Sequence, residues 1–179
     1  NKSKTKLKIK TICVGNIYIG GTGKTSLSIK INKLLSQKNI KSCFIKKFYK
    51  DQLDEQKLLS SNGKLFNTQT RLEALRQAEK ENYEVAILDD GLQDISINHN
   101  LSFICFNNIS WIGNGLTIPA GPLREKLSVL KNYNHVFLNG NLENLENIIY
   151  KLKTINPNLI VHLGKYEPVN LDQFSAKDK

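Results

Sequence analysis

A glycine-rich segment near the start of the chain has the sequence Gly15-Asn16-Ile17-Tyr18-Ile19-Gly20-Gly21-Thr22-Gly23-Lys24-Thr25. It lies between a short apolar, strand-like run at residues 11–14 and a segment whose apolar side chains recur at helical spacing until about Gln37. Glycines at such a junction let backbone N–H groups curl around phosphate oxygens. A lysine and a threonine at the helix start supply a charge for the β- and γ-phosphates and a hydroxyl ligand for Mg²⁺.

The segment therefore predicts a phosphate-binding loop for ATP, and its predicted nucleotide contacts are Gly20, Gly21, Thr22, Gly23, Lys24, Thr25 and Ser26. The strict pattern has a glycine five residues before Gly23, where this chain has Tyr18, so the loop is a variant in which Gly20 and Gly21 compensate. A plain glycine turn before an amphipathic helix would explain the glycines. It would not explain lysine and threonine at the helix start.

The rest of the chain alternates between apolar strand-like runs and helical patterns. Strands are predicted at residues 43–45, 85–88, 101–106, 135–138 and 159–161. Helices are predicted at 71–81, at 124–131, and from Leu142 to a point before Pro157, whereas residues 46–69 look polar and irregular. This pattern predicts an α/β fold of the P-loop NTPase type, with a mostly parallel sheet and helices on both faces.

Two further motifs contain candidate ligands for Mg²⁺ and phosphate. Asp89 and Asp90 follow the apolar run at 85–88, and an acid at the carboxyl end of a strand is where P-loop enzymes hold Mg²⁺. Without the upstream loop, a simple turn would be an equally good interpretation. The second motif, at residues 118–125, places Arg124 at the opening of a predicted helix, where its guanidinium could donate two bonds to a phosphate. Only three arginines occur, Arg71, Arg76 and Arg124, which draws attention to each of them.

Composition narrows the class of protein. The chain has 179 residues, 40% of them hydrophobic and 23% charged, which excludes disorder throughout and predicts one domain or one domain and the start of another. No apolar run approaches the roughly 20 residues of a membrane-spanning helix, and no secretory signal follows the basic first ten residues. The net charge of +10 suits a surface that meets phosphates, or simply a preference for lysine at solvated positions.

The sequence positions of the cysteines and histidines indicate structural roles and not metal binding. The cysteines lie far apart in apolar runs, which predicts buried, reduced thiols in a reducing compartment, and the histidines show no metal-site spacing. The residues concerned are Cys13, Cys43, Cys105, His99, His135 and His162.

The three motifs together resemble the tetraacyldisaccharide 4′-kinase family of the lipid A pathway, over about residues 9–170. The resemblance implies a P-loop fold, ATP and Mg²⁺, and transfer of the γ-phosphate to the 4′-hydroxyl of a tetraacyl disaccharide 1-phosphate. The product would be lipid IVA, made at the cytoplasmic face of the bacterial inner membrane. The implied partners are the lipid disaccharide and the membrane surface, with no nucleic acid.

The resemblance also assigns roles. Lys24 and Thr25 match the family's nucleotide and Mg²⁺ positions, and Asp89, Asp90 and Gln93 match its acidic Mg²⁺ motif. Asp54 matches the aspartate that is the family's proposed general base. Arg71 and Arg124 match arginines that would bind the transferring or substrate phosphate. The predicted catalytic set is therefore Asp54, Lys24, Arg71 and Arg124.

This chain departs from the family pattern in several places. Asp94 stands where the family has histidine, Leu53 and Gln56 flank the Asp54-Glu55 pair in place of glycine and proline, and lysines at 46–47 replace an expected arginine. The family's N-terminal membrane helix and its second lobe are not in the sequence. We therefore expect a kinase core domain over residues 1–165, the start of a linker over 166–179, and little activity from this piece alone.

Two other functions fit parts of the pattern. A switch-type P-loop ATPase that binds a membrane or protein partner would share the glycine-rich loop, but it has no use for the segment around Arg124. A nucleic-acid-binding module would suit the positive charge, but it would place exposed aromatics among basic clusters. Here the aromatics lie mostly within strand-like runs.

Overall fold

The computed structural model describes residues 7–49, 52–141, 143 and 145–165. In chain order the elements are β1 (Lys10–Gly15), α1 (Lys24–Gln37), β2 (Ser42–Lys47), α2 (Leu53–Ser61), β3 (Leu65–Thr68), α3 (Arg71–Lys80), β4 (Val85–Asp89), β5 (Leu101–Asn107), the 3₁₀ helix η1 (Leu127–Asn132), β6 (His135–Asn139), α4 (Glu146–Ile155) and β7 (Ile160–Gly164). None of the helices described is both long enough and apolar enough to cross a bilayer.

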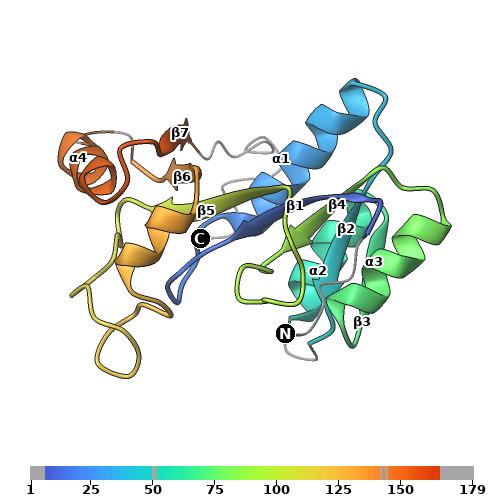
Figure 1. Cartoon of the computed structure of the whole chain (residues 1–179), viewed down its shortest axis with the longest axis horizontal. Coiled ribbons are helices and arrows are strands. Elements are labelled where there is room, and N and C mark those ends of the chain that lie inside the picture. The colour runs from blue at the N-terminus through green and yellow to red at the C-terminus, as the bar shows by residue number, and fades with distance from the viewer. Residues whose placement is uncertain (1–6, 50–51, 142, 144, 166–179) are drawn as a thin grey trace, which may run out of the picture.

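The strands form one parallel sheet in the order β3-β2-β4-β1-β5-β6-β7 (Figure 1). β1 lies between β4 and β5, and its residue Val14 is in register with Asp89 on one side and Phe103 on the other. Because β1 and β4 run parallel, the loop after β1 and the acidic residues after β4 emerge at the same edge of the sheet. The predicted P-loop type of α/β fold is confirmed.

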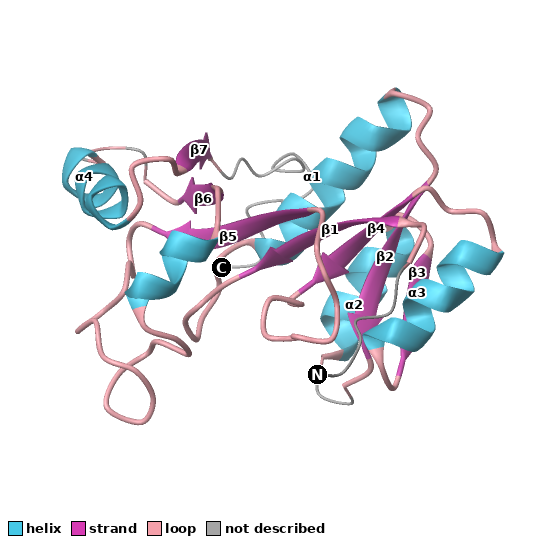
Figure 2. Ribbon diagram, viewed as in Figure 1, coloured by secondary structure: helices cyan, strands magenta, loops and turns pink. Residues whose placement is uncertain are grey.

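Helices cover both faces of the sheet (Figure 2). Val14 and Ile87 belong to a buried cluster that packs against α1 and α2. Their chain neighbours Cys13 and Leu88 belong to a second cluster, with α3, η1 and α4. Alternate residues of a strand point to opposite faces, so these two clusters lie on opposite sides of the sheet. The uniformly apolar strands follow from this arrangement, because both sides of each strand are buried.

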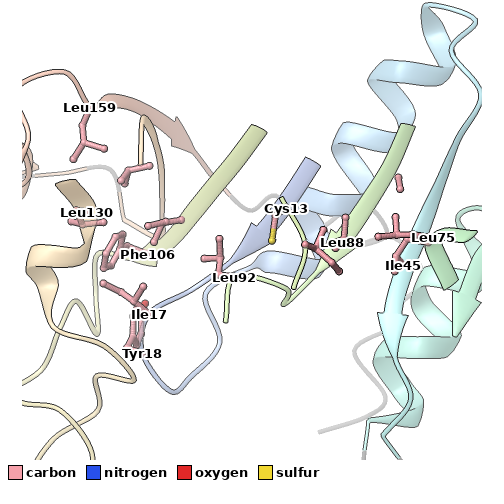
Figure 3. Packing of buried hydrophobic residues seen from close by; sticks show 14 of the residues in the cluster. Cys13, Ile17, Tyr18, Ile45, Leu75, Leu88, Leu92, Phe106, Leu130 and Leu159 are labelled. Atoms are coloured by element: carbon pink, nitrogen blue, oxygen red, sulfur yellow. The ribbon is translucent and has the colours of Figure 1, made fainter. Parts of the chain in front are cut away.

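The larger cluster extends across most of the sheet, from Leu75 and Ile45 at one end to Leu130 and Leu159 at the other (Figure 3). Cys13, Cys43 and Cys105 are free thiols and are fully buried within the two clusters, as predicted. Burial raises the pKa of Cys13 and of Cys43 to about 12, so these thiols stay protonated at neutral pH.

The expectation of an irregular segment over residues 46–69 is wrong, because α2 and β3 lie there. Only Gln56 and Leu59 of α2 are buried, so the helix has little apolar pattern to detect. β3 is a four-residue edge strand with one buried side chain, Phe66. Short edge elements of this kind carry a weak sequence signal.

The helix expected at residues 124–131 is also wrong in part. The backbone N–H of Arg124 donates to the carbonyl of Ile17 at 2.7 Å, and Lys126 is extended, so only the 3₁₀ helix η1 forms further along. The last strand begins at Ile160 and ends at Gly164, later than predicted. The helix expected from Leu142 begins at Glu146, and Leu142 itself lies outside the described residues.

The histidines show no metal-site spacing in the sequence, but the sheet places two of them side by side. Nδ1 of His135 on β6 lies 3.1 Å from Nε2 of His162 on β7, and both rings pack near Phe103. Burial and the neighbouring His135 lower the pKa of His162. Among the described residues, no group of three His, Cys, Asp or Glu side chains lies close enough together to hold a metal ion.

Candidate active site

The glycine-rich loop leads from β1 into α1 through two residues with positive φ. Gly20 has a φ of 134° and Gly23, the residue before α1, has a φ of 76°. Residues that carry a side chain rarely adopt these backbone conformations, so both positions favour glycine. A Cβ placed on Gly21 would meet no atom within 4 Å, so the space beside the loop is open. The positive end of α1 and its first N–H groups therefore border a space that an anion can enter.

Two asparagines hold the loop in shape. Asn16 donates from Nδ2 to Oγ1 of Thr22 at 3.2 Å and to the carbonyl of Gly20 at 3.4 Å. Asn139, at the end of β6, donates from Nδ2 to the carbonyl of Thr22. Gln93 in turn donates from Nε2 to the carbonyl of Asn16 at 3.1 Å. These bonds fix the loop before any nucleotide arrives, which reduces the entropy lost on binding.

The first turn of α1 presents the three predicted polar residues. Lys24 and Thr25 are partly buried, and Ser26 is exposed. Thr25 donates from Oγ1 to Oδ2 of Asp89 at 3.3 Å. The hydroxyl and the carboxylate predicted to serve Mg²⁺ are therefore neighbours, one in the first turn of α1 and the other at the end of β4.

Asp89 is fully buried at the end of β4 and makes three polar contacts. Besides the bond from Thr25, it accepts a hydrogen bond from Ser28 Oγ at 3.2 Å and one from Lys46 Nζ at 2.9 Å. A buried carboxylate requires such compensation, because burial without partners costs several kcal/mol. The contacts hold the side chain of Asp89 in one orientation behind the glycine-rich loop.

Lys46 bridges two carboxylates from inside the protein. It is 1% exposed, and its Nζ lies 2.9 Å from Asp89 and 2.5 Å from Glu55 Oε2. Burial alone would lower the pKa of Lys46, but the charge of Asp89 and the hydrogen bonds to both carboxylates outweigh it, and the pKa lies above its ordinary value. The ammonium thus occupies a position between carboxylates where a cation is favoured.

This donor set fits Mg²⁺. The neighbouring side chains of Thr25 and Asp89 offer a hydroxyl and a carboxylate, and Mg²⁺ prefers oxygen ligands. In kinases this ion usually takes one or two protein ligands and completes its shell with phosphate oxygens and water. The small number of protein donors is consistent with that mode of binding.

Asp90, which follows Asp89 directly in the sequence, contacts a different cation. Asp90 has a φ of 57°, and its backbone N–H donates to the carbonyl of Val14 at 2.8 Å. Its carboxylate accepts from Arg124 NH1, at 3.1 Å to Oδ1 and 3.3 Å to Oδ2. Asp89 and Asp90 are adjacent in sequence but are held by different cations, Lys46 and Arg124.

Arg71, the first residue of α3, also contacts the acidic segment that follows β4. Its NH2 donates to the carbonyl of Asp90 at 2.5 Å, and its NH1 lies 3.6 Å from Oδ2 of Asp94. Burial acts to raise the pKa of Asp94, but hydrogen bonds from Ser96 and the charge of Arg71 lower it below its ordinary value. Asp94 is therefore an anionic partner of Arg71.

The two predicted arginines line one open cavity of about 770 Å³. Lys47 and Tyr49 contribute to its wall, together with Asp90 and Gln93. Arginine and lysine side chains around one cavity make it suitable for a phosphate-bearing ligand. Gln93 also donates to Oε1 of Glu125 at 3.0 Å, which links the acidic motif to the segment after Arg124.

Asp54 lies in the first turn of α2 and is exposed. Its neighbour Glu55 is the residue that contacts Lys46, at 2.5 Å. Asp54 is not part of the contact network around Asp89, although α2 brings it to the same edge of the sheet. Its role as a general base stays a prediction.

Sequence reasoning missed several residues of this site. Lys46 was noted only as a departure from the family pattern, and Ser28, Asn16 and Asn139 were not singled out at all. Lys46 did leave a signal, since it follows the apolar residues 43–45 in a run that had to be buried. Asn139 could not be found in this way, because its partner is a backbone carbonyl 117 residues away. Asn16 lies within the glycine-rich loop, and its type alone does not indicate the bonds to Gly20 and Thr22.

Open space beside a glycine-rich loop at a helix start, with Lys24 and Thr25 on that helix and a buried aspartate at the end of β4, is the arrangement of P-loop nucleotide-binding proteins. The profile of the family described as tetraacyldisaccharide-1-P 4′-kinase matches residues 1–68 and 50–178. The chain belongs to the tetraacyldisaccharide 4′-kinase family.

Individual relatives agree with the profile. The chain is 61% identical over 176 residues to a tetraacyldisaccharide 4′-kinase from Pelagibacter ubique, which covers 97% of this chain and 56% of that protein. It is 31% identical to one from Legionella pneumophila strain Lens, over 94% of this chain and 57% of that protein. The chain thus spans little more than half the length of these relatives.

A solved structure is similar in fold. It is the "apo" form of LpxK from Aquifex aeolicus in complex with ATP, with a TM-score of 0.64 and 25% sequence identity. The similarity covers 79% of this chain and 51% of the Aquifex chain. The fold assigned above is therefore that of a protein whose solved structure contains ATP.

Proposed function

We propose that this chain is the nucleotide-binding part of a Mg²⁺-dependent kinase that transfers the γ-phosphate of ATP to the 4′-hydroxyl of a tetraacyldisaccharide 1-phosphate. The product would be lipid IVA, made at the cytoplasmic face of the bacterial inner membrane. The observation that carries the proposal is the placement of the glycine-rich loop and Asp89 beside a cavity lined by Arg71 and Arg124. One edge of the sheet thus offers a place for ATP and a place for a second phosphate-bearing molecule.

The positions of these residues and the family resemblance support a role for each of them. Lys24 and the loop N–H groups would bind the β- and γ-phosphates, and Arg71 and Arg124 would bind the transferring phosphate or the substrate phosphate. Asp54 would accept the proton of the sugar hydroxyl. Mg²⁺, when bound, would neutralise charge on the phosphates, with Thr25 and Asp89 as its closest candidate ligands and Asp90 and Gln93 as the further ones that the family pattern names.

The test uses a chimera in which this chain replaces the aligned portion of the Pelagibacter kinase. We expect the chimera, with Mg²⁺ and radiolabelled ATP, to place label on the 4′ position of tetraacyldisaccharide 1-phosphate. ATP hydrolysis that vesicles or DNA stimulate, with no labelled lipid, would instead identify a switch-type ATPase. Binding of a fluorescent ATP analogue shows in either case whether the chimera is folded.

Arg124 provides a sharper prediction within the same assay. Arg124→Lys keeps the positive charge but loses the planar pair of donors that a phosphate accepts. We expect kcat/KM of the chimera to fall by roughly 10- to 100-fold, as for loss of one charge-assisted hydrogen bond. The melting temperature should hardly change, because a partly exposed ion pair such as that with Asp90 contributes little stability.

Arg76→Lys is the matched control, since Arg76 is exposed on α3 and should tolerate the same change. A large drop in melting temperature with normal kinetics for Arg124→Lys would show that Arg124 serves the fold and not the substrate.

A further inference from the structure

A buried lysine lies beside the position predicted for Mg²⁺. Lys46 is on β2, which pairs with β4, and its side chain is 2% exposed (Figure 1). Its Nζ lies 2.9 Å from Oδ2 of Asp89 at the end of β4 and 2.5 Å from Oε2 of Glu55 on α2. Lysine is almost never buried to this extent unless carboxylates pair with it. The ammonium group is therefore held in place by residues from two other elements.

One oxygen of Asp89 is shared between Lys46 and the predicted Mg²⁺ ligand Thr25. Thr25 donates from Oγ1 to Oδ2 of Asp89 at 3.3 Å, and Lys46 Nζ lies 2.9 Å from the same oxygen. The other oxygen, Oδ1, accepts a hydrogen bond from Ser28 at 3.2 Å. A metal ion that bound Asp89 through Oδ2 would share this oxygen with the ammonium. Lys46 is therefore an immediate neighbour of the position where Mg²⁺ is expected.

The position of the ammonium also suits a divalent cation. Carboxylates from two different elements, Asp89 and Glu55, contact the one nitrogen atom. Mg²⁺ binds oxygen at about 2.0–2.1 Å, so each carboxylate would need to move by less than about 1 Å to bind an ion placed there. The side chain of Glu55 is 48% exposed, which gives an ion a path from the solvent. A second metal ion could bind there if the lysine were absent.

The balance of charged groups explains why a lysine and a metal ion exclude one another. The affinity of a site for a divalent cation rises with the number of charged oxygen ligands that it offers. Lys46 offsets one of the two carboxylates, so the pair attracts a further cation less strongly. Some enzymes that transfer phosphoryl groups hold two divalent cations between carboxylates and phosphates. In this chain a lysine supplies positive charge beside the predicted Mg²⁺ ligands.

We propose that the Lys46 ammonium takes the place of a second divalent cation, so that the site holds a single Mg²⁺, which enters with ATP. This inference rests on the proposed function, because it assumes that Mg²⁺ binds beside Thr25 and Asp89 together with the nucleotide. Without ATP, the ammonium occupies the position between Asp89 and Glu55, and the free protein has little affinity for divalent cations. The phosphates of ATP then supply the oxygen ligands that the protein alone does not offer.

The experiment measures the binding of Mn²⁺ by electron paramagnetic resonance. Mn²⁺ prefers the same carboxylate and water ligands as Mg²⁺. Without nucleotide, we expect Lys46→Met to bind Mn²⁺ at least about tenfold more tightly than the unmodified chain, because both carboxylates are then available to the ion. Methionine keeps most of the aliphatic length of lysine and removes the ammonium. With a non-hydrolysable ATP analogue, the unmodified chain should bind one Mn²⁺ and the variant should bind two.

Two further variants serve as controls. Lys57→Met removes the same charge from an exposed position on α2 and should bind Mn²⁺ as the unmodified chain does. The double variant Lys46→Met/Glu55→Gln loses one of the two carboxylates, so its affinity for Mn²⁺ should fall back toward that of the unmodified chain. This loss would place the additional ion between Asp89 and Glu55.

The folding of Lys46→Met is followed in the same samples, since the variant leaves a buried carboxylate without its cation. We expect Mn²⁺, added without nucleotide, to raise the melting temperature of the variant by more than that of the unmodified chain. A variant that is unfolded in a chelator and refolds with Mn²⁺ would support the proposal equally. A variant that Mn²⁺ neither stabilises nor binds would overturn it.

Other results would also overturn the proposal. One is equal affinity for Mn²⁺ in the unmodified chain and in a folded Lys46→Met variant, and another is an equal number of Mn²⁺ ions in their complexes with the ATP analogue. The nucleotide-free measurement contains neither ATP nor the disaccharide lipid, so its result stands even if the chimera phosphorylates nothing. Phosphorylation by the chimera, combined with equal affinities for Mn²⁺, would overturn the role of Lys46 and leave the kinase proposal in place.

Discussion

Lys24→Ala should weaken the binding of Mg²⁺·ATP by at least about tenfold, and up to roughly 100-fold. Lys24 is the first residue of α1 and follows the left-handed Gly23, so its side chain borders the open space beside the loop. A charged hydrogen bond to phosphate contributes about 1.5–3 kcal/mol, and alanine leaves nothing in its place. Titration of a fluorescent ATP analogue measures the change directly and can be done with this chain alone.

Lys30→Ala is the control for this measurement. Lys30 is exposed on the same helix, six residues closer to its C-terminal end. Its substitution by alanine removes the same charge from the protein as Lys24→Ala does. If both variants bind the analogue as tightly as the unmodified chain does, the glycine-rich loop is not the nucleotide site.

Asp54→Asn should lower kcat of the chimera by about 10²- to 10⁴-fold while the affinity for ATP holds. A sugar hydroxyl must lose its proton as it bonds to phosphorus, and a carboxylate within hydrogen-bond reach can accept it. Asp89 is engaged by Lys46, Ser28 and Thr25, and Glu55 by Lys46, whereas Asp54 is exposed at the start of α2. Among the described acidic residues of this region, Asp54 is thus exposed and not engaged by a cation, whereas Glu55, although half-exposed, is paired with Lys46.

The comparison with Glu55→Gln decides the assignment. Glu55→Gln removes a charge partner of the buried Lys46, so it should lower the melting temperature, which Asp54→Asn should not do. Glu73→Gln, an exposed acid in the first turn of α3, should change neither quantity. If Glu55→Gln or Asp51→Asn causes the large loss of kcat while Asp54→Asn does not, the base is misassigned; Asp51 lies outside the described residues.

Much of the architecture could be predicted because strands buried on both faces are apolar throughout. The runs at 85–88 and 101–106 became β4 and β5 with changes of a residue at the ends. α2 could not be predicted, since a helix with two buried residues has little apolar periodicity. The 3₁₀ helix η1 displaced the helix expected at 124 because a contact distant in sequence, from Arg124 to Ile17, holds the chain extended there.

The site was predictable where chemistry depends on residue type at fixed spacing, as with Lys24, Thr25 and Asp89. The contacts between residues from different helices, strands and loops could not be predicted. The bond between Arg124 and Asp90 joins residues 34 positions apart, and that between Lys46 and Asp89 joins residues 43 apart. The spacing of residues along the sequence does not show that these pairs are in contact. The strand order of the sheet brings the partners together.

The strand order also has a consequence for synthesis on the ribosome. β1, which leads into the nucleotide loop, emerges first but belongs at the middle of the sheet, between β4 and β5. At roughly 5–20 residues per second, the chain up to the end of β4 follows only about 4–15 s later. During that interval an apolar strand with both edges unpaired has no native partner. Because Asp89 ends β4, the helix start at Thr25 gains the buried carboxylate of its site only once β4 is made.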